Sequence, residues 1–162
     1  MERVIVIGCP GAGKSTFARR LQGVTGLPLI HLDMLFWNED KTTVSREEFD
    51  KRLKSVLTTQ KWIIDGNYSR TLEMRMNVCD TVCFLDLPTE ECLLGVRARI
   101  GTKRLDIPWV ETEENAEFMQ FIKDFTEARR PQILALLEKY NDKDIIVFHS
   151  HSEIDRYLSK LG

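Results

Sequence analysis

Eight consecutive residues near the N-terminus have the types and spacing of a phosphate-binding loop. The run Gly8-Cys9-Pro10-Gly11-Ala12-Gly13-Lys14-Ser15 matches the pattern G-x-x-x-x-G-K-[ST] in full. Glycines let backbone N–H groups converge on phosphate oxygens, the lysine reaches the β and γ phosphates, and the serine hydroxyl coordinates Mg²⁺. An apolar run, residues 4–7, precedes the motif, and a helix is predicted after it over Ser15 to Leu21. The sequence therefore predicts a site for ATP and Mg²⁺, with nucleotide-binding residues Gly8, Pro10, Gly11, Ala12, Gly13, Lys14, Ser15 and Thr16.

The remaining sequence narrows the reaction that such a loop could serve. A GTPase needs the guanine-reading string N-K-x-D, whereas the nearest string here, residues 141–144, reads N-D-K-D. With 162 residues, the chain is also too short for a helicase or transporter ATPase core. We expect a small kinase in which Lys14 stabilises the γ-phosphoryl group during its transfer to a small-molecule acceptor.

Acidic residues close three of the predicted strands, where ligands bind in an open α/β sheet. Asp33 follows residues 29–32 and is predicted to accept a proton from an acceptor hydroxyl or to orient it; a loop cap before Met34 is the alternative. Asp65 follows residues 62–64 and is predicted to hold Mg²⁺, together with Ser15, or to contact the acceptor. Asp86 precedes Leu87-Pro88 and is interpreted as structural.

A cluster of basic residues lies in the second half of the chain. Four cations occur within eight residues that contain no acid, and an acidic run follows directly. Arginines on a mobile segment can neutralise charge during phosphoryl transfer and exclude water. We therefore predict a lid over about residues 97–115; a solvated helix face balanced by the nearby acids is the alternative. The predicted catalytic lid residues are Arg97, Arg99 and Arg104.

The histidines and cysteines indicate less about function than the phosphate-binding loop and the acidic residues do. We expect His31 to be packed inside a strand, and His149 and His151 to lie in a loop, where they either line a base pocket or are solvated. The four cysteines contain no C-x-x-C pair or zinc spacing, so they are interpreted as reduced thiols, mostly in the core.

Apolar runs alternate with helical patterns, which is typical of βαβ units and a parallel sheet. Ser45 and Glu48 form a capping box before an amphipathic helix, Pro131 interrupts a helical pattern over residues 116–140, and Ser152 is predicted to open a last helix through Leu161. We expect one α/β domain over residues 1–162, a doubly wound sheet with helices on both faces. The predicted strands are Arg3 to Ile7, Leu29 to Asp33, Trp62 to Asp65, Thr81 to Leu87 and Ile145 to His149.

Charge and hydropathy argue against a nucleic-acid-binding protein and against a membrane protein. Lys and Arg total 23 against 25 Asp and Glu, a formal net charge of −2, so the chain has no overall basic field for nucleic acid. The longest apolar run has five residues, far short of the roughly 20 that a membrane span needs, and no signal-peptide pattern precedes the phosphate-binding loop. We therefore expect a cytoplasmic protein without a membrane or nucleic-acid partner.

Several strings resemble those of the adenylate-kinase-like small-molecule kinases, and more closely those of the bacterial DNA topology modulation proteins. The resemblance runs through most of the chain. It rests on residues 8–16, His31-Leu32-Asp33 with Phe36-Trp37, Trp62-Ile63-Ile64-Asp65-Gly66-Asn67-Tyr68, Arg75 with Asp80-Thr81-Val82, Leu85-Asp86-Leu87-Pro88, and Arg130-Pro131.

This resemblance implies a sheet in the order 2-3-1-4-5, with Asp65 beside the phosphate-binding loop, Asp33 on the outer strand and a lid after the fourth strand. It also implies an acceptor-binding region over about residues 34–60. Adenylate kinases continue from the segment matching Asp65-Gly66 into a proline and an arginine that grips a nucleoside monophosphate, whereas this chain continues Asn67-Tyr68-Ser69-Arg70. The candidates for an acceptor anion are Arg70, Arg75 and Arg130.

These features favour an ATP- and Mg²⁺-dependent kinase of a nucleoside, nucleotide or other metabolite. An ATP-binding regulatory protein of the topology-modulation type, with little or no turnover, is the alternative. A nucleic-acid-binding protein is a third reading, which the absence of a helix-turn-helix signature and of a basic tail disfavours.

Overall fold

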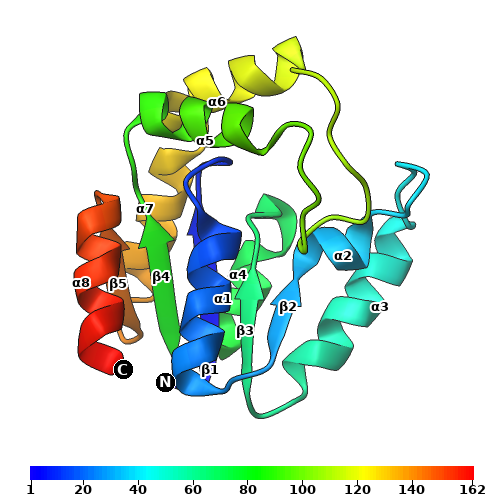
Figure 1. The fold of residues 1–162 in the computed structure, drawn as a ribbon. Helices are drawn as coiled ribbons and strands as arrows, with labels where there is room; N and C mark the ends of the chain where they lie inside the picture. Colours follow the sequence, from blue (N-terminus) through cyan, green and yellow to red (C-terminus); the bar gives the residue numbers. More distant parts are fainter.

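A computed structural model describes all residues, 1–162, as a three-layer α/β domain (Figure 1). Its five parallel strands lie in the order β2-β3-β1-β4-β5, which confirms the predicted sheet. Helices α1 and α8 pack side by side on one face, and α4 and α7 lie on the other (Figure 1). The strands are β1 (Arg3–Gly8), β2 (Leu29–His31), β3 (Trp62–Asp65), β4 (Thr81–Leu85) and β5 (Asp144–Phe148). The helices are α1 (Lys14–Thr25), α2 (Leu32–Phe36), α3 (Arg46–Leu57), α4 (Ser69–Val78), α5 (Thr89–Arg99), α6 (Ala116–Ala128), α7 (Arg130–Lys139) and α8 (His151–Leu161).

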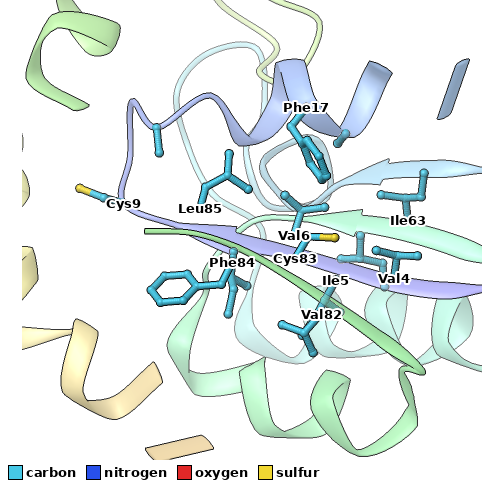
Figure 2. Close-up of a cluster of buried hydrophobic side chains, with 14 of the residues drawn as sticks. Val4, Ile5, Val6, Cys9, Phe17, Ile63, Val82, Cys83, Phe84 and Leu85 are labelled. Atoms are coloured by element: carbon cyan, nitrogen blue, oxygen red, sulfur yellow. The ribbon is translucent and has the colours of Figure 1, made fainter. Parts of the chain in front are cut away.

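The central strands are buried on both faces, as continuous apolar runs predict. Every residue of β3 and β4 is buried. Side chains alternate across β4: Cys83 faces Phe17 of α1, whereas Val82 and Phe84 point to the opposite layer (Figure 2). All four cysteines are free and buried within this framework.

The register of the sheet brings the candidate residues to one edge. Val6 of β1 lies beside Asp65 of β3, and Asp65 lies beside His31 of β2. The phosphate-binding loop, which continues from β1, therefore emerges next to the ends of β2 and β3.

Several predicted boundaries were wrong. Strand β2 ends at His31, so Asp33 lies in the first turn of α2 and does not close the strand. Strand β4 ends at Leu85, before Asp86. Helix α8 is capped by Ser150, whose Oγ accepts a hydrogen bond from the Glu153 amide, and not by Ser152.

The predicted start of α3 and the predicted interruption at Pro131 are confirmed. Ser45 Oγ accepts a hydrogen bond from the Glu48 amide and begins α3. The helical pattern over residues 116–140 divides into α6 and α7, with Pro131 in the first turn of α7. Residues 100–115, most of the predicted lid, contain neither helix nor strand and connect α5 to α6. None of the helices combines the length and apolar content that a membrane crossing requires.

Candidate active site

A cavity of about 1320 Å³ opens at the carboxyl ends of the strands. Its volume exceeds the roughly 300–1,000 Å³ of a typical single-ligand pocket, so it has room for a nucleotide and a second molecule. Predicted site residues from four separate segments of the chain line this cavity. Among those that line it are Lys14, Ser15, Asp33, Asp65, Arg99 and Arg104.

The phosphate-binding loop forms one wall of this cavity. Gly11 and Gly13 have φ angles of 85° and 95°, in the left-handed region that glycine adopts without strain. Gly13 caps α1 without a side-chain hydrogen bond, so the first amides of that helix are free to meet an anion. Lys14 Nζ lies 3.3 Å from the Cys9 carbonyl oxygen, to which it donates, and so folds back over the loop.

Burial lowers the pKa of Lys14, because it disfavours the charged ammonium, while Asp65, Cys9 and Asp33 oppose this shift. The opposing carboxylates face the same space as the ammonium. Phosphates entering this space would add negative charge around Lys14 and stabilise it further.

Oxygen donors for a cation are present but few. Ser15 Oγ accepts a hydrogen bond from Arg19 Nη1 at 2.7 Å, and Asp65 lies across the cavity at the end of β3. No group of three or more His, Cys, Asp or Glu side chains could hold a metal by itself. This donor set fits Mg²⁺, which is commonly held by one or two side chains together with phosphate oxygens and water.

Two polar residues that the sequence analysis left without a role organise the loop after β3. Asn67 Oδ1 accepts a hydrogen bond from the Gly8 amide at 3.0 Å, and Asn67 Nδ2 donates to the Gly8 carbonyl at 2.6 Å. Asn67 therefore ties this loop to the start of the phosphate-binding loop. Tyr68 donates a hydrogen bond to Asp33 Oδ1.

The two predicted carboxylates have different partners. Asp65 is only 6% exposed, and its Oδ2 lies 2.7 Å from His31 Nδ1. Asp33 lines the cavity, and burial raises its pKa, while the hydrogen bond from Tyr68 lowers it. His31 is thus packed as predicted, with the added role of holding Asp65.

Of the predicted lid arginines, Arg99 and Arg104 reach the cavity and Arg97 does not. Arg104 is bonded to Asp106 at 2.6 and 2.9 Å and to Glu111 at 2.7 Å. Arg97 is exposed and pairs with Glu114 at 3.4 Å, outside the cavity, so its catalytic role stays a prediction without support from this geometry. Arg97 and Arg99 lie two residues apart on α5, roughly 200° around the helix, so both could not face the same space.

The three arginines predicted for an acceptor anion lie in three different environments. Arg70 lines the rim of the cavity but forms two hydrogen bonds to Asp50, at 2.6 and 3.0 Å. Arg75 is 0% exposed, does not line the cavity and donates to the carbonyl oxygens of residues 66–68, so the structure does not place it where an acceptor could reach it. Arg130 is bonded to Asp86 through three hydrogen bonds and does not line the cavity, so its acceptor role stays a prediction and the pair supports a structural Asp86.

The first residue of α8, His151, lines the cavity, so its predicted place in a loop is wrong. His151 Nε2 lies 3.3 Å from the Ala12 carbonyl oxygen of the phosphate-binding loop. His149 is exposed beside Asp86 and does not line the cavity.

Helix α5 packs against the phosphate-binding loop through two glycines. A Cβ added to Gly95 would overlap the carbonyl oxygen of Gly11 and lie 3.0 Å from its carbonyl carbon. A Cβ on Gly11 would in turn overlap the carbonyl oxygen of Cys92. The loop and the helix that leads into residues 100–115 are therefore in direct backbone contact.

Because of this contact, we expect glycine-to-alanine substitutions in α5 and in α1 to have opposite effects on stability. Gly95→Ala should lower the unfolding free energy by roughly 1–3 kcal/mol and weaken ATP binding, because backbone atoms must move apart. Gly23→Ala in α1, where a Cβ meets nothing within 4 Å, should stabilise the protein by about 0.5–1 kcal/mol. Urea unfolding and ATP titration of both variants check this; equal stabilisation by the two substitutions would contradict the contact.

Comparison with known proteins places this cavity in a kinase fold. No family model matches the sequence. Over 80 residues, 49% of this chain, it is 30% identical to the adenylate kinases of Thermotoga petrophila and Thermotoga maritima. The matched segment covers 36% of those proteins, so the chain spans about a third of the length of these relatives.

Solved structures match nearly the whole chain. Shikimate kinase from Bacteroides thetaiotaomicron has a TM-score of 0.59 at 20% identity, with 99% of this chain and 96% of that chain covered. Shikimate kinase from Acinetobacter baumannii, in complex with shikimate, has a TM-score of 0.61 at 15% identity, with 99% and 93% covered. The chain therefore has the P-loop kinase fold of these structures and is similar in part of its sequence to adenylate kinases; the closer resemblance to topology modulation proteins stays a prediction.

Proposed function

We propose that the protein is an ATP- and Mg²⁺-dependent phosphotransferase that moves the γ-phosphoryl group of ATP to a small-molecule acceptor. One observation carries this proposal. The phosphate-binding loop, the carboxylates of Asp33 and Asp65 and two arginines of the predicted lid share one cavity that is large enough for two ligands. The similarity to adenylate kinases and the fold shared with shikimate kinases support it.

The proposed role of each residue follows from its position. The phosphate-binding loop would hold the ATP phosphates, with Lys14 on the migrating group. Ser15 and Asp65 would hold Mg²⁺, which when bound neutralises charge on the β and γ phosphates. Residues of the lid, Arg99 and Arg104, would close over them, and the acceptor would lie beside Asp33. No residue of the predicted acceptor-binding region, about 34–60, lines this cavity, so that region stays a prediction.

Acceptor-dependent release of ADP tests this function. The protein is incubated with ATP and Mg²⁺, and a panel of nucleosides, nucleotides and hydroxylated metabolites is added one compound at a time. We expect at least one compound to raise ADP release well above the level without acceptor. ATP binding without stimulation by any compound would contradict the kinase and favour the regulatory alternative.

A further inference from the structure

We propose that Asp33 and Tyr68 form a hydroxyl-activating pair, so that the phosphoryl group goes to a carbon-bound hydroxyl and the product is a phosphate monoester. This inference rests on the proposed kinase function and specifies its acceptor. A kinase that phosphorylates a phosphate would instead form an anhydride.

Tyr68 is held in an unusual conformation at the edge of the cavity. Its φ and ψ angles are 40° and 67°, a left-handed conformation that is rare for a tyrosine and costs energy. The ring packs against Phe36 and Phe49, each with its centroid 5.2 Å from that of Tyr68, and the two phenylalanine rings also contact each other. The Tyr68 carbonyl oxygen accepts hydrogen bonds from the Thr71 amide and from buried Arg75. Strain of this kind persists only where the surroundings hold it, and here it aims the hydroxyl at Asp33.

Asp33 keeps one oxygen available for a ligand. Tyr68 donates to Oδ1, while Oδ2 accepts no hydrogen bond from the protein. Burial raises the pKa of Tyr68, so the phenol keeps its proton and acts as the donor. Asp33 and Lys14 line the same cavity, and the charge of Lys14 lowers the pKa of Asp33, so the carboxylate shares the space in which Lys14 would meet the γ phosphate. An acceptor hydroxyl that donates to Oδ2 would therefore meet the phosphoryl group.

The charges around Asp33 favour a neutral reacting group over a phosphate. Asp65 and Asp106 both raise the pKa of Asp33 through their negative charge, so three carboxylates act on one region. Three of the arginines near these carboxylates already have acceptors on the protein, whereas Arg99 has only a 3.9 Å contact with Glu111 and is the arginine left to meet the ATP phosphates. The three with acceptors are Arg70 with Asp50, Arg75 with three backbone carbonyls, and Arg104 with Asp106 and Glu111.

The transfer balances without a further reactant. The acceptor oxygen forms a bond to the γ phosphorus, and the bond between that phosphorus and the β–γ bridging oxygen breaks, with its electron pair leaving on ADP. The hydroxyl proton passes to Asp33 Oδ2 and then to water. An alcohol and ATP thus yield a phosphate monoester, ADP and one proton.

The chemical class of the product tests the inference before the acceptor is identified. The protein is incubated with Mg²⁺, ATP carrying radioactive γ-phosphorus and a deproteinised metabolite extract. We expect label in a small molecule that survives hot dilute acid and is released by a phosphomonoesterase. Label that hot acid releases, as from an anhydride, would overturn this inference and leave the kinase intact. No transferred label, with ATP bound, would overturn both.

Two variants test the pair itself. Asp33→Asn should lower transfer by about 10²- to 10⁴-fold, the usual contribution of a general base. Tyr68→Phe removes a hydrogen bond that lowers the pKa of Asp33, so that pKa should rise. Because the base works as the carboxylate, the acidic limb of kcat/KM should move to higher pH in Tyr68→Phe.

The matched control is Tyr140→Phe, because Tyr140 OH donates to exposed Glu73 outside the cavity. This variant should keep the wild-type pH profile, and thermal unfolding of each variant checks that it is folded. A Tyr68→Phe enzyme that loses rate at all pH values alike, with its acidic limb unmoved, would show a purely structural tyrosine and overturn the pairing.

Discussion

Lys14→Ala is expected to lower turnover by about 10²- to 10³-fold while the protein stays folded. Removing one preorganised donor that stabilises transition-state charge typically has this effect. The fold should lose little, because Lys14 makes one long hydrogen bond, 3.3 Å to the Cys9 carbonyl oxygen, and burial disfavours its charged form. The melting temperature should therefore equal or exceed that of the wild type. Single-turnover transfer of label and thermal unfolding measure the two effects.

Lys160→Ala provides the control, because Lys160 is exposed in the last turn of α8. It should keep wild-type turnover. If Lys14→Ala transferred phosphoryl groups at the wild-type rate, the assignment of the loop would fail. If it unfolded, Lys14 would have a structural role that its contacts do not show.

The phosphate-binding loop and the sheet could be predicted because both depend on local patterns. The spacing of Gly8, Gly13 and Lys14 encodes a backbone shape directly, and buried parallel strands are continuous apolar runs. Asp65 follows from the same logic, since it ends such a run. Asp33 lines the cavity although β2 ends at His31, two residues before its predicted end. At either end point of the strand, Asp33 lies at or beyond the carboxyl end of β2.

The direction of single side chains could not be predicted in the same way. Arg70 and Arg75 lie five residues apart on α4, roughly 140° around the helix, so one faces the rim when the other faces the core. Which one is buried depends on how α4 packs against the sheet. The left-handed Tyr68 has no sequence signature, although Gly66-Asn67 signals the turn before it.

Buried Arg75 links the stability of the protein to the proposed hydroxyl-activating pair. Burial lowers its pKa to about 9, so the guanidinium is still protonated at neutral pH. It donates to the carbonyl oxygens of Gly66, Asn67 and Tyr68, the segment that positions the Tyr68 hydroxyl. The Tyr68 carbonyl keeps a hydrogen bond from the Thr71 amide without Arg75. The carbonyls of Gly66 and Asn67 would lose the donor that Arg75 provides.

Arg75→Met is expected to reduce the unfolding free energy by about 3 kcal/mol. Each buried carbonyl left without a donor costs roughly 1–3 kcal/mol, and relief of the buried charge offsets part of this. For a domain of this size, the melting temperature should fall by roughly 6–12 °C. Turnover should also fall at temperatures where the variant is folded, because residues 66–68 no longer fix Tyr68 against Asp33.

Arg156→Met is the matched control, because Arg156 is exposed on α8. Its stability should stay within about 0.5 kcal/mol of the wild type. An Arg75→Met protein that melts within about 2 °C of the wild type would mean that water or a shifted backbone satisfies these carbonyls. A folded Arg75→Met protein with normal turnover would show that the Phe36 and Phe49 rings and the Thr71 amide hold Tyr68 without Arg75.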